Sequence, residues 1–155
     1  MLGFFNKLNH SIVFKNWKRE NKESFLSGCF TMLEDKEEFW QFDFYNKDTG
    51  KMTSFKVDKD IEVMPNDDVF SEDKELISGI NIEEVKKDIN VVLDNVNSKY
   101  NGVKKKIVIL QNKKRLIWNI TLLLGDLNVV NLNISAENGE VLKENKECLI
   151  KFSKP

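Results

Sequence analysis

Residues 116–134 read LIWNITLLLGDLNVVNLNI, and this stretch decides the fold. On both sides of Gly125 and Asp126, apolar residues alternate with asparagine or threonine, which is the period of two of a strand with one buried face. Gly-Asp is a tight-turn signal, so the two strands are expected to form an antiparallel hairpin. An apolar sheet face needs a cover, and the stretch therefore predicts a helix packed on it.

The covering helix is expected immediately upstream, over residues 82–100. Its apolar face consists of Ile82, Val85, Ile89, Val92, Leu93, Val96 and Tyr100. Asn81 as N-cap and Glu84 three residues later form a capping-box signature, and Gly102 follows the end of the pattern. Further strands are predicted at 105–110 and, as a short edge strand, at 148–152.

The first half of the chain shows the same order of patterns. Apolar residues at helical spacing predict a helix over residues 2–22, with lysines on its other side. Three strands are predicted next, at 24–33, 38–45 and 53–57. In the first of them Leu26, Phe30 and Met32 fall at even spacing, which predicts that they share a face. Residues 58–79 are acidic and contain Pro65, which predicts a long loop.

Helix, strand, aromatic strand, turn and strand thus arrive twice, and Trp40 and Trp118 hold corresponding places. We predict an α+β fold of two units, each a helix on an antiparallel three-stranded sheet, either separate or merged into one pseudo-symmetric domain. The predicted boundaries are 1–63 for the first unit, 64–80 for an acidic linker and 81–155 for the second unit.

The second half resembles a PepSY domain over residues 82–142. The capped helix, the aromatic strand beginning at Leu116 and the closing stretch 131–142, NLNISAENGEVL, carry the resemblance. That stretch is similar to the family's V-D-A-x-T-G-E-V signature, with Ser135 at the usual Asp position and Asn138 at the Thr position. Gly139 suits the turn because it tolerates positive φ. The resemblance implies a PepSY/cystatin-like fold, with residues 1–63 as a divergent second copy, and an inhibitory, non-catalytic role toward proteases.

Charge is balanced overall but unevenly distributed. The chain has 24 basic and 25 acidic residues, a net charge of −1, which excludes a globally basic nucleic-acid binder. Residues 1–19 carry four bases and no acid, and residues 20–80 are predominantly acidic. A charged partner would therefore meet one region of the molecule.

The residues that could carry chemistry are few. His10 is the single histidine, and Cys29 and Cys148 lack the flanking motif of a thiol enzyme or a metal site. The two cysteines are either free thiols or one long-range disulfide. The acidic stretch 58–73 lacks the glycine and glutamate spacing of an EF-hand. We therefore predict no catalytic, cofactor-binding or metal-ligating residues, no cofactor, and a protein that is not an enzyme.

The prediction for function is a binding or regulatory module that holds a protein partner by its sheet face or an edge strand, with a homodimer through an edge strand as a variant. The alternative is a peripheral membrane or nucleic-acid adaptor that uses the basic N-terminal segment and the runs 104–106 and 113–115. These runs would lie at opposite ends of one strand, and Trp118 is expected in the core, which disfavours nucleic acid. No apolar run is long enough to span a bilayer and no signal peptide is visible, so a cytoplasmic location is expected, or an envelope location if the sequence is trimmed.

Overall fold

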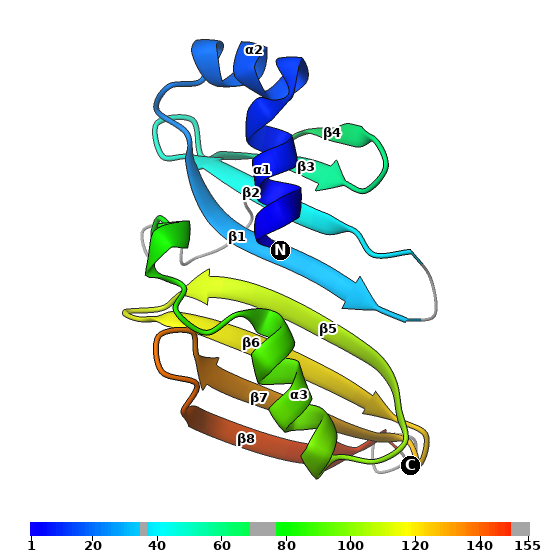
Figure 1. The fold of residues 1–155 in the computed structure, drawn as a ribbon. Coiled ribbons are helices and arrows are strands. Elements are labelled where there is room, and N and C mark those ends of the chain that lie inside the picture. The colour runs from blue at the N-terminus through cyan, green and yellow to red at the C-terminus, as the bar shows by residue number, and fades with distance from the viewer. Residues whose placement is uncertain (35–36, 69–76, 150–155) are drawn as a thin grey trace, which may run out of the picture.

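The computed structural model describes residues 1–34, 37–68 and 77–149, and in this part of the chain all strands belong to one eight-stranded antiparallel sheet. The strands are β1 (Phe25–Leu33), β2 (Trp40–Asn46), β3 (Lys51–Val57), β4 (Ile61–Asp68), β5 (Val103–Asn112), β6 (Leu116–Leu124), β7 (Asn128–Ser135) and β8 (Val141–Cys148). The helices are α1 (Leu2–His10), α2 (Ile12–Glu20), the 3₁₀ turn η2 (Ile82–Glu84) and α3 (Ile89–Lys99). The strand order is β4-β3-β2-β1-β5-β6-β7-β8, and α1, α2 and α3 lie on the same face of the sheet (Figure 1).

The prediction of two helix-plus-three-strand units of PepSY/cystatin-like fold is wrong. Strands β1 and β5 pair with each other from Cys29↔Leu110 to Leu33↔Lys106, which joins both halves into one continuous sheet. Each half contributes four strands, because β4 and β8 extend the hairpins at the two edges. The predicted hairpin of β6 and β7 is confirmed, with Trp118 opposite Ile134.

Both additional strands are edge strands with few apolar side chains. β4 lies where the acidic loop was predicted, and it runs into the predicted linker. β8 ends at Cys148, where the final edge strand was predicted to begin; residues 150–152 of that prediction lie outside the described residues. An edge strand needs only the backbone groups of its neighbour, so its side chains need not show an apolar alternation.

The N-terminal helical segment is divided at Ser11. This residue has extended backbone angles, and its hydroxyl donates to the carbonyl of Leu8 (2.7 Å) and accepts from the amide of Phe14 (3.1 Å). It therefore ends α1 and caps α2 at once. The two short helices replace the single predicted helix, and the break lets both reach the sheet.

The second covering helix begins later than the sequence predicts. Asn81 caps only the turn η2, accepting from the amide of Glu83 (3.1 Å). The amides of Lys86 and Lys87 donate to the carbonyl of Ala136 (3.0 and 2.9 Å), in the turn between β7 and β8. Those amides bind the sheet instead of continuing a helix, and α3 starts only after Asp88, its N-cap.

The core lies between the sheet and the helices, and one row of paired residues shows how continuous it is. Across six neighbouring strands the row contains Phe55, Phe42, Cys29, Leu110, Trp118 and Ile134, each at most 3% exposed. The rings of Trp40 and Trp118 approach each other at 6.3 Å between centroids, so the two predicted halves share this core. The relation of the halves as copies of one repeat stays a prediction.

Candidate functional site

The candidate site lies on the face of the sheet opposite α1, α2 and α3, which carries no helix of residues 1–34, 37–68 and 77–149 and is called the helix-free face. Its centre is the central apolar stripe, defined here as Phe30 and Met32 of β1 with Ile107 and Ile109 of β5. Phe30 pairs with Ile109 and Met32 with Ile107, and all four side chains are partly exposed. Each is one residue away from a fully buried residue of the opposite face, as Ile109 is from Leu110.

The stripe contradicts the predicted pattern of the first strand. Even spacing placed Phe30 and Met32 on the face of Leu26, but the pairing of β1 with β2 shifts register between Leu26 and Gly28. This bulge inserts one residue, so every later side chain of β1 changes face. Cys29 then occupies the core position and Phe30 turns to the helix-free face.

Hydrogen-bonded polar side chains border the stripe on the side of β6 and β7. The amide of Asn119 donates to Asn133 (2.6 Å) and to Asn131 (3.2 Å). Asn131 donates in turn to the hydroxyl of Thr121 (2.9 Å). These partly exposed amides are held by one another, which keeps them in place at the surface.

A second polar group borders the stripe on the side of β2 and β3. Asp43 accepts from the hydroxyl of Ser54 (2.5 Å) and from the amide of Gln41 (2.9 Å). An apolar centre with a polar, hydrogen-bonded rim is the composition of many protein interfaces.

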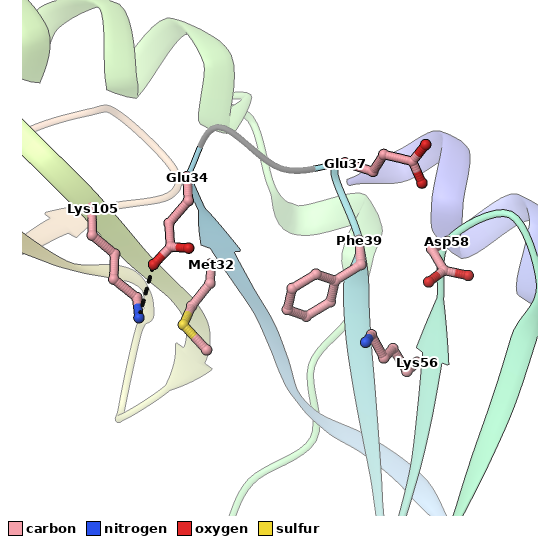
Figure 2. A pocket seen from close by; sticks show the side chains of 7 residues that line it. All are labelled: Met32, Glu34, Glu37, Phe39, Lys56, Asp58 and Lys105. Atoms are coloured by element: carbon pink, nitrogen blue, oxygen red, sulfur yellow. Dashed lines mark ion pairs between the residues drawn. The ribbon is translucent and has the colours of Figure 1, made fainter.

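One end of the stripe opens into a pocket of about 780 Å³. Its lining consists of Met32, Glu34, Glu37, Phe39, Lys56, Asp58 and Lys105. Phe39, directly before β2, points toward Met32, and Lys105 pairs with Glu34 on the other side (3.1 Å; Figure 2). The Phe39 ring lies 6.1 Å from that of Phe30, so the pocket continues the stripe.

The charges in this pocket are largely engaged with the protein itself. The ammonium of Lys56 lies 4.8 Å from the centre of the Phe39 ring, a cation–π contact. Glu37 pairs with Lys59 (2.9 Å) outside the lining, and both side chains are more than two-thirds exposed. The pocket therefore combines apolar side chains with ionic groups of both signs. This composition suits the binding of a partner surface that carries both polar and apolar groups.

The edges of the sheet are less suited to a partner strand. On β8, Lys143, Glu144, Lys146 and Glu147 are exposed. Pro65 lies in β4 and has no amide hydrogen to offer. Charged side chains and proline are the usual means by which edge strands avoid further pairing.

The residues considered for catalysis lie apart. His10 is exposed at the end of α1, with Nδ1 2.7 Å from the carbonyl oxygen of Asn6. Cys29 is fully buried, and burial raises the pKa of its thiol far above the ordinary value. The absence of enzymatic activity stays a prediction.

Both cysteines are free. β5, β6 and β7 lie between the strands that carry them, a separation of roughly 19 Å at the usual strand spacing. A disulfide needs Cα atoms within about 7 Å, so the fold leaves Cys29 and Cys148 as separate thiols.

The acidic and basic runs do not form compact clusters in the part of the chain that can be described. Among residues 1–34, 37–68 and 77–149, no group of three or more His, Cys, Asp or Glu side chains has the arrangement of a metal site. Of the acidic stretch, residues 69–76 lie outside the described chain. The basic runs 104–106 and 113–115 lie at opposite ends of β5, as expected. No described helix has the length and apolar character needed to cross a membrane.

Sequence reasoning missed the central apolar stripe, although a signal for it exists. Residues 107–110 read IVIL, which is apolar at both parities of a strand. Such a run indicates a central strand with apolar residues on both faces. The run predicts an apolar patch on the second face, but it does not say that helices leave that face uncovered.

Comparison with known proteins gives a likeness of fold. No protein-family model matches the chain, and no curated protein matches it. Among solved structures, the chain is similar to a crystal structure described as a "putative lipoprotein" from Clostridium difficile 630, with a TM-score of 0.62 and 16% sequence identity. The match covers 87% of this chain and 90% of the other. At this identity the likeness shows the shared fold alone.

Proposed function

We propose that this protein is a non-catalytic binding module whose central apolar stripe holds a protein partner. The observation that carries the proposal is the set of four partly exposed apolar side chains, paired across β1 and β5 in the middle of a face without helices. An exposed apolar patch with a polar rim is typical of a surface that binds another protein.

The face is favoured over an edge strand as the binding element. The edges carry charged residues and Pro65, whereas the stripe has an apolar centre and a rim of fixed amides and hydroxyls. We therefore place the partner on the face and expect pairing through β8, including a homodimer, to contribute little.

Because residues 82–142 resemble a PepSY domain, we further propose that the partner is a protease. Its closing residues form β7, the turn at Gly139 and the start of β8, and Gly139 has the expected positive φ of 79°. The resemblance supports an inhibitory role for the module, and a purified protease partner would be inhibited on binding.

The test is photo-crosslinking followed by titration of the purified partner. A photoreactive amino acid is placed at Phe30, at Asn145 on the edge strand β8, or at Val91, which is 51% exposed on α3. The protein crosslinked from position 30 is identified, purified and titrated against Phe30→Glu and Val91→Glu.

We expect Phe30→Glu to weaken binding by about tenfold or more, since it places a charge in the middle of the apolar contact. Val91→Glu makes the same kind of change on the helix side and should leave the affinity unaltered. Equal unfolding midpoints of the two variants exclude a folding defect as the cause. Crosslinks from Asn145 alone, or full affinity of Phe30→Glu, would overturn the proposal.

A further inference from the structure

We propose that the basic corner of the molecule docks on an anionic phospholipid membrane. The basic corner is defined as Ile12, Val13, Lys15, Arg19 and Lys22, from α2 and the turn that follows it. α2 lies crosswise at the end of α1, at the margin of the molecule (Figure 1). It is therefore separate from the helix-free face.

Two aliphatic side chains at this corner are left outside the core. Ile12 is 75% exposed and Val13 is 47% exposed. They are exposed because the cap at Ser11 fixes where α2 begins, so that Phe14 and Trp17 take the inward positions. The rings of these two residues lie 5.1 to 5.4 Å from Phe44 and Phe55 of the core.

Cations lie on the same helix as the aliphatic pair and in the turn that follows it. Asn9, Phe14, Lys15, Lys18, Arg19 and Lys22 line a shallow hollow of about 420 Å³. Lys15, Arg19 and Lys22 are exposed, and none of them makes a salt bridge within the described chain. Lys18 differs from these three exposed cations, because it is partly buried. Its ammonium donates to the carbonyl of Ser24, and burial lowers its pKa.

The acids of this region lie at one end of α2. Residues 1–19 contain no acid; Glu20 is the exposed last residue of α2, and Glu23 is exposed in the turn that follows. Ile12, Lys15 and Arg19 follow the spacing of one helix face, so the face opposite Phe14 and Trp17 is aliphatic at its start and cationic along its length.

An anionic bilayer fits this combination better than a nucleic acid does. Aliphatic side chains next to cations enter the boundary between headgroups and acyl chains, while the cations meet lipid phosphates. A single-strand binder needs free aromatic rings for base stacking, and here the rings of Phe14 and Trp17 pack against the core. With two aliphatic side chains, the contact is expected to be weak, reversible and sensitive to salt.

The test is cosedimentation of the full chain with vesicles of phosphatidylglycerol and phosphatidylcholine, compared with vesicles of phosphatidylcholine alone. We expect binding only to the anionic vesicles and release at high salt, because salt screens exposed charges. Lys15→Glu/Arg19→Glu should lower binding by about tenfold or more. Ile12→Ser/Val13→Ser should lower binding at unchanged charge.

The matched control is Lys143→Glu/Lys146→Glu, which makes the same charge change on the distant edge strand β8 and should leave vesicle binding unaltered. Thermal unfolding verifies that every variant is folded. Equal binding to both vesicle types, or undiminished binding of Lys15→Glu/Arg19→Glu, would overturn the proposal. Displacement by inorganic phosphate at the concentration of the headgroups would indicate a free-phosphate site instead. Preferential competition by a single-stranded oligonucleotide would indicate a nucleic-acid surface instead, and either outcome would refute membrane docking.

Discussion

The two faces of the sheet are built from the same strands but differ in the burial of their side chains. On the covered face, Cys29, Leu110 and Trp118 form part of a row in which each residue is fully buried. One residue further along the strands, Phe30, Ile109 and Asn119 form the corresponding row of the helix-free face and stay partly exposed. The comparison teaches that burial under the helices, not apolar character alone, decides which side chains stabilise the fold.

The largest expected effect concerns the two thiols, one in the core of the covered face and one on the edge strand β8. The thiolate is the reactive form of cysteine, and burial both shields the sulfur of Cys29 and raises its pKa. Cys148 is only partly buried. We expect Cys148 to react quickly with a maleimide in the native protein. Cys29 should react at least about a thousandfold more slowly, because it becomes accessible only when the protein unfolds.

Mass spectrometry after timed labelling checks this expectation. Cys148→Ser should remove the fast reaction, and Cys29→Ala should leave it. Equal rates for both thiols would contradict the burial of Cys29, and the absence of any free thiol without reductant would contradict the separation of the two cysteines.

The next effect is the loss of stability on truncation of Trp118. Its ring is fully buried against Trp40, and its indole nitrogen donates to the carbonyl of Lys87 (2.9 Å). Trp118→Ala should lower the free energy of unfolding by about 3–5 kcal/mol, through the cavity and the unpaired carbonyl. Trp118→Phe should cost less because it keeps most of the packing. Urea unfolding measures both, and a cost below that of Ile109→Ala would contradict the shared core.

A pair of neighbours on β5 compares the faces directly. Leu110→Ala should cost about 2–5 kcal/mol of unfolding free energy, because the side chain is fully buried. Ile109→Ala, on the helix-free face, should cost about 1 kcal/mol or less. In the binding assay the order should be reversed: Ile109→Ala should weaken the affinity for the partner more than Leu110→Ala does, because Ile109 belongs to the stripe. Equal costs in urea unfolding would mean that both faces are buried in solution.

A small effect, similar to that of Ile109→Ala, is expected from the polar rim. Asn119→Ala removes hydrogen bonds to Asn131 and Asn133 that are partly exposed, so it should cost about 1 kcal/mol of unfolding free energy. Asn145→Ala, on the exposed edge of the sheet, is the control and should change stability little. A loss for Asn119→Ala as large as that for Leu110→Ala would show that the helix-free face takes part in the folding core.

The amino-acid sequence by itself determined the local elements with strong patterns. The hairpin of residues 116–134, the turn at Gly139 and the amphipathic residues of α3 follow from alternation, positive φ and helical spacing, all of which act over a few residues. The strands β1, β2 and β3 were also predicted near their observed bounds for this reason.

Only the tertiary structure decided which strands are neighbours and which face is free. The pairing of β1 with β5, and the edge strands β4 and β8, depend on backbone hydrogen bonds that any side chain permits, so no local pattern indicates them. The bulge after Leu26 shifts Phe30 to the opposite face through one extra residue, and the stripe arises only when that residue meets Ile109 across the junction. The candidate site could not be predicted because it is made of contacts between distant segments, whereas sequence patterns report the period of each segment alone.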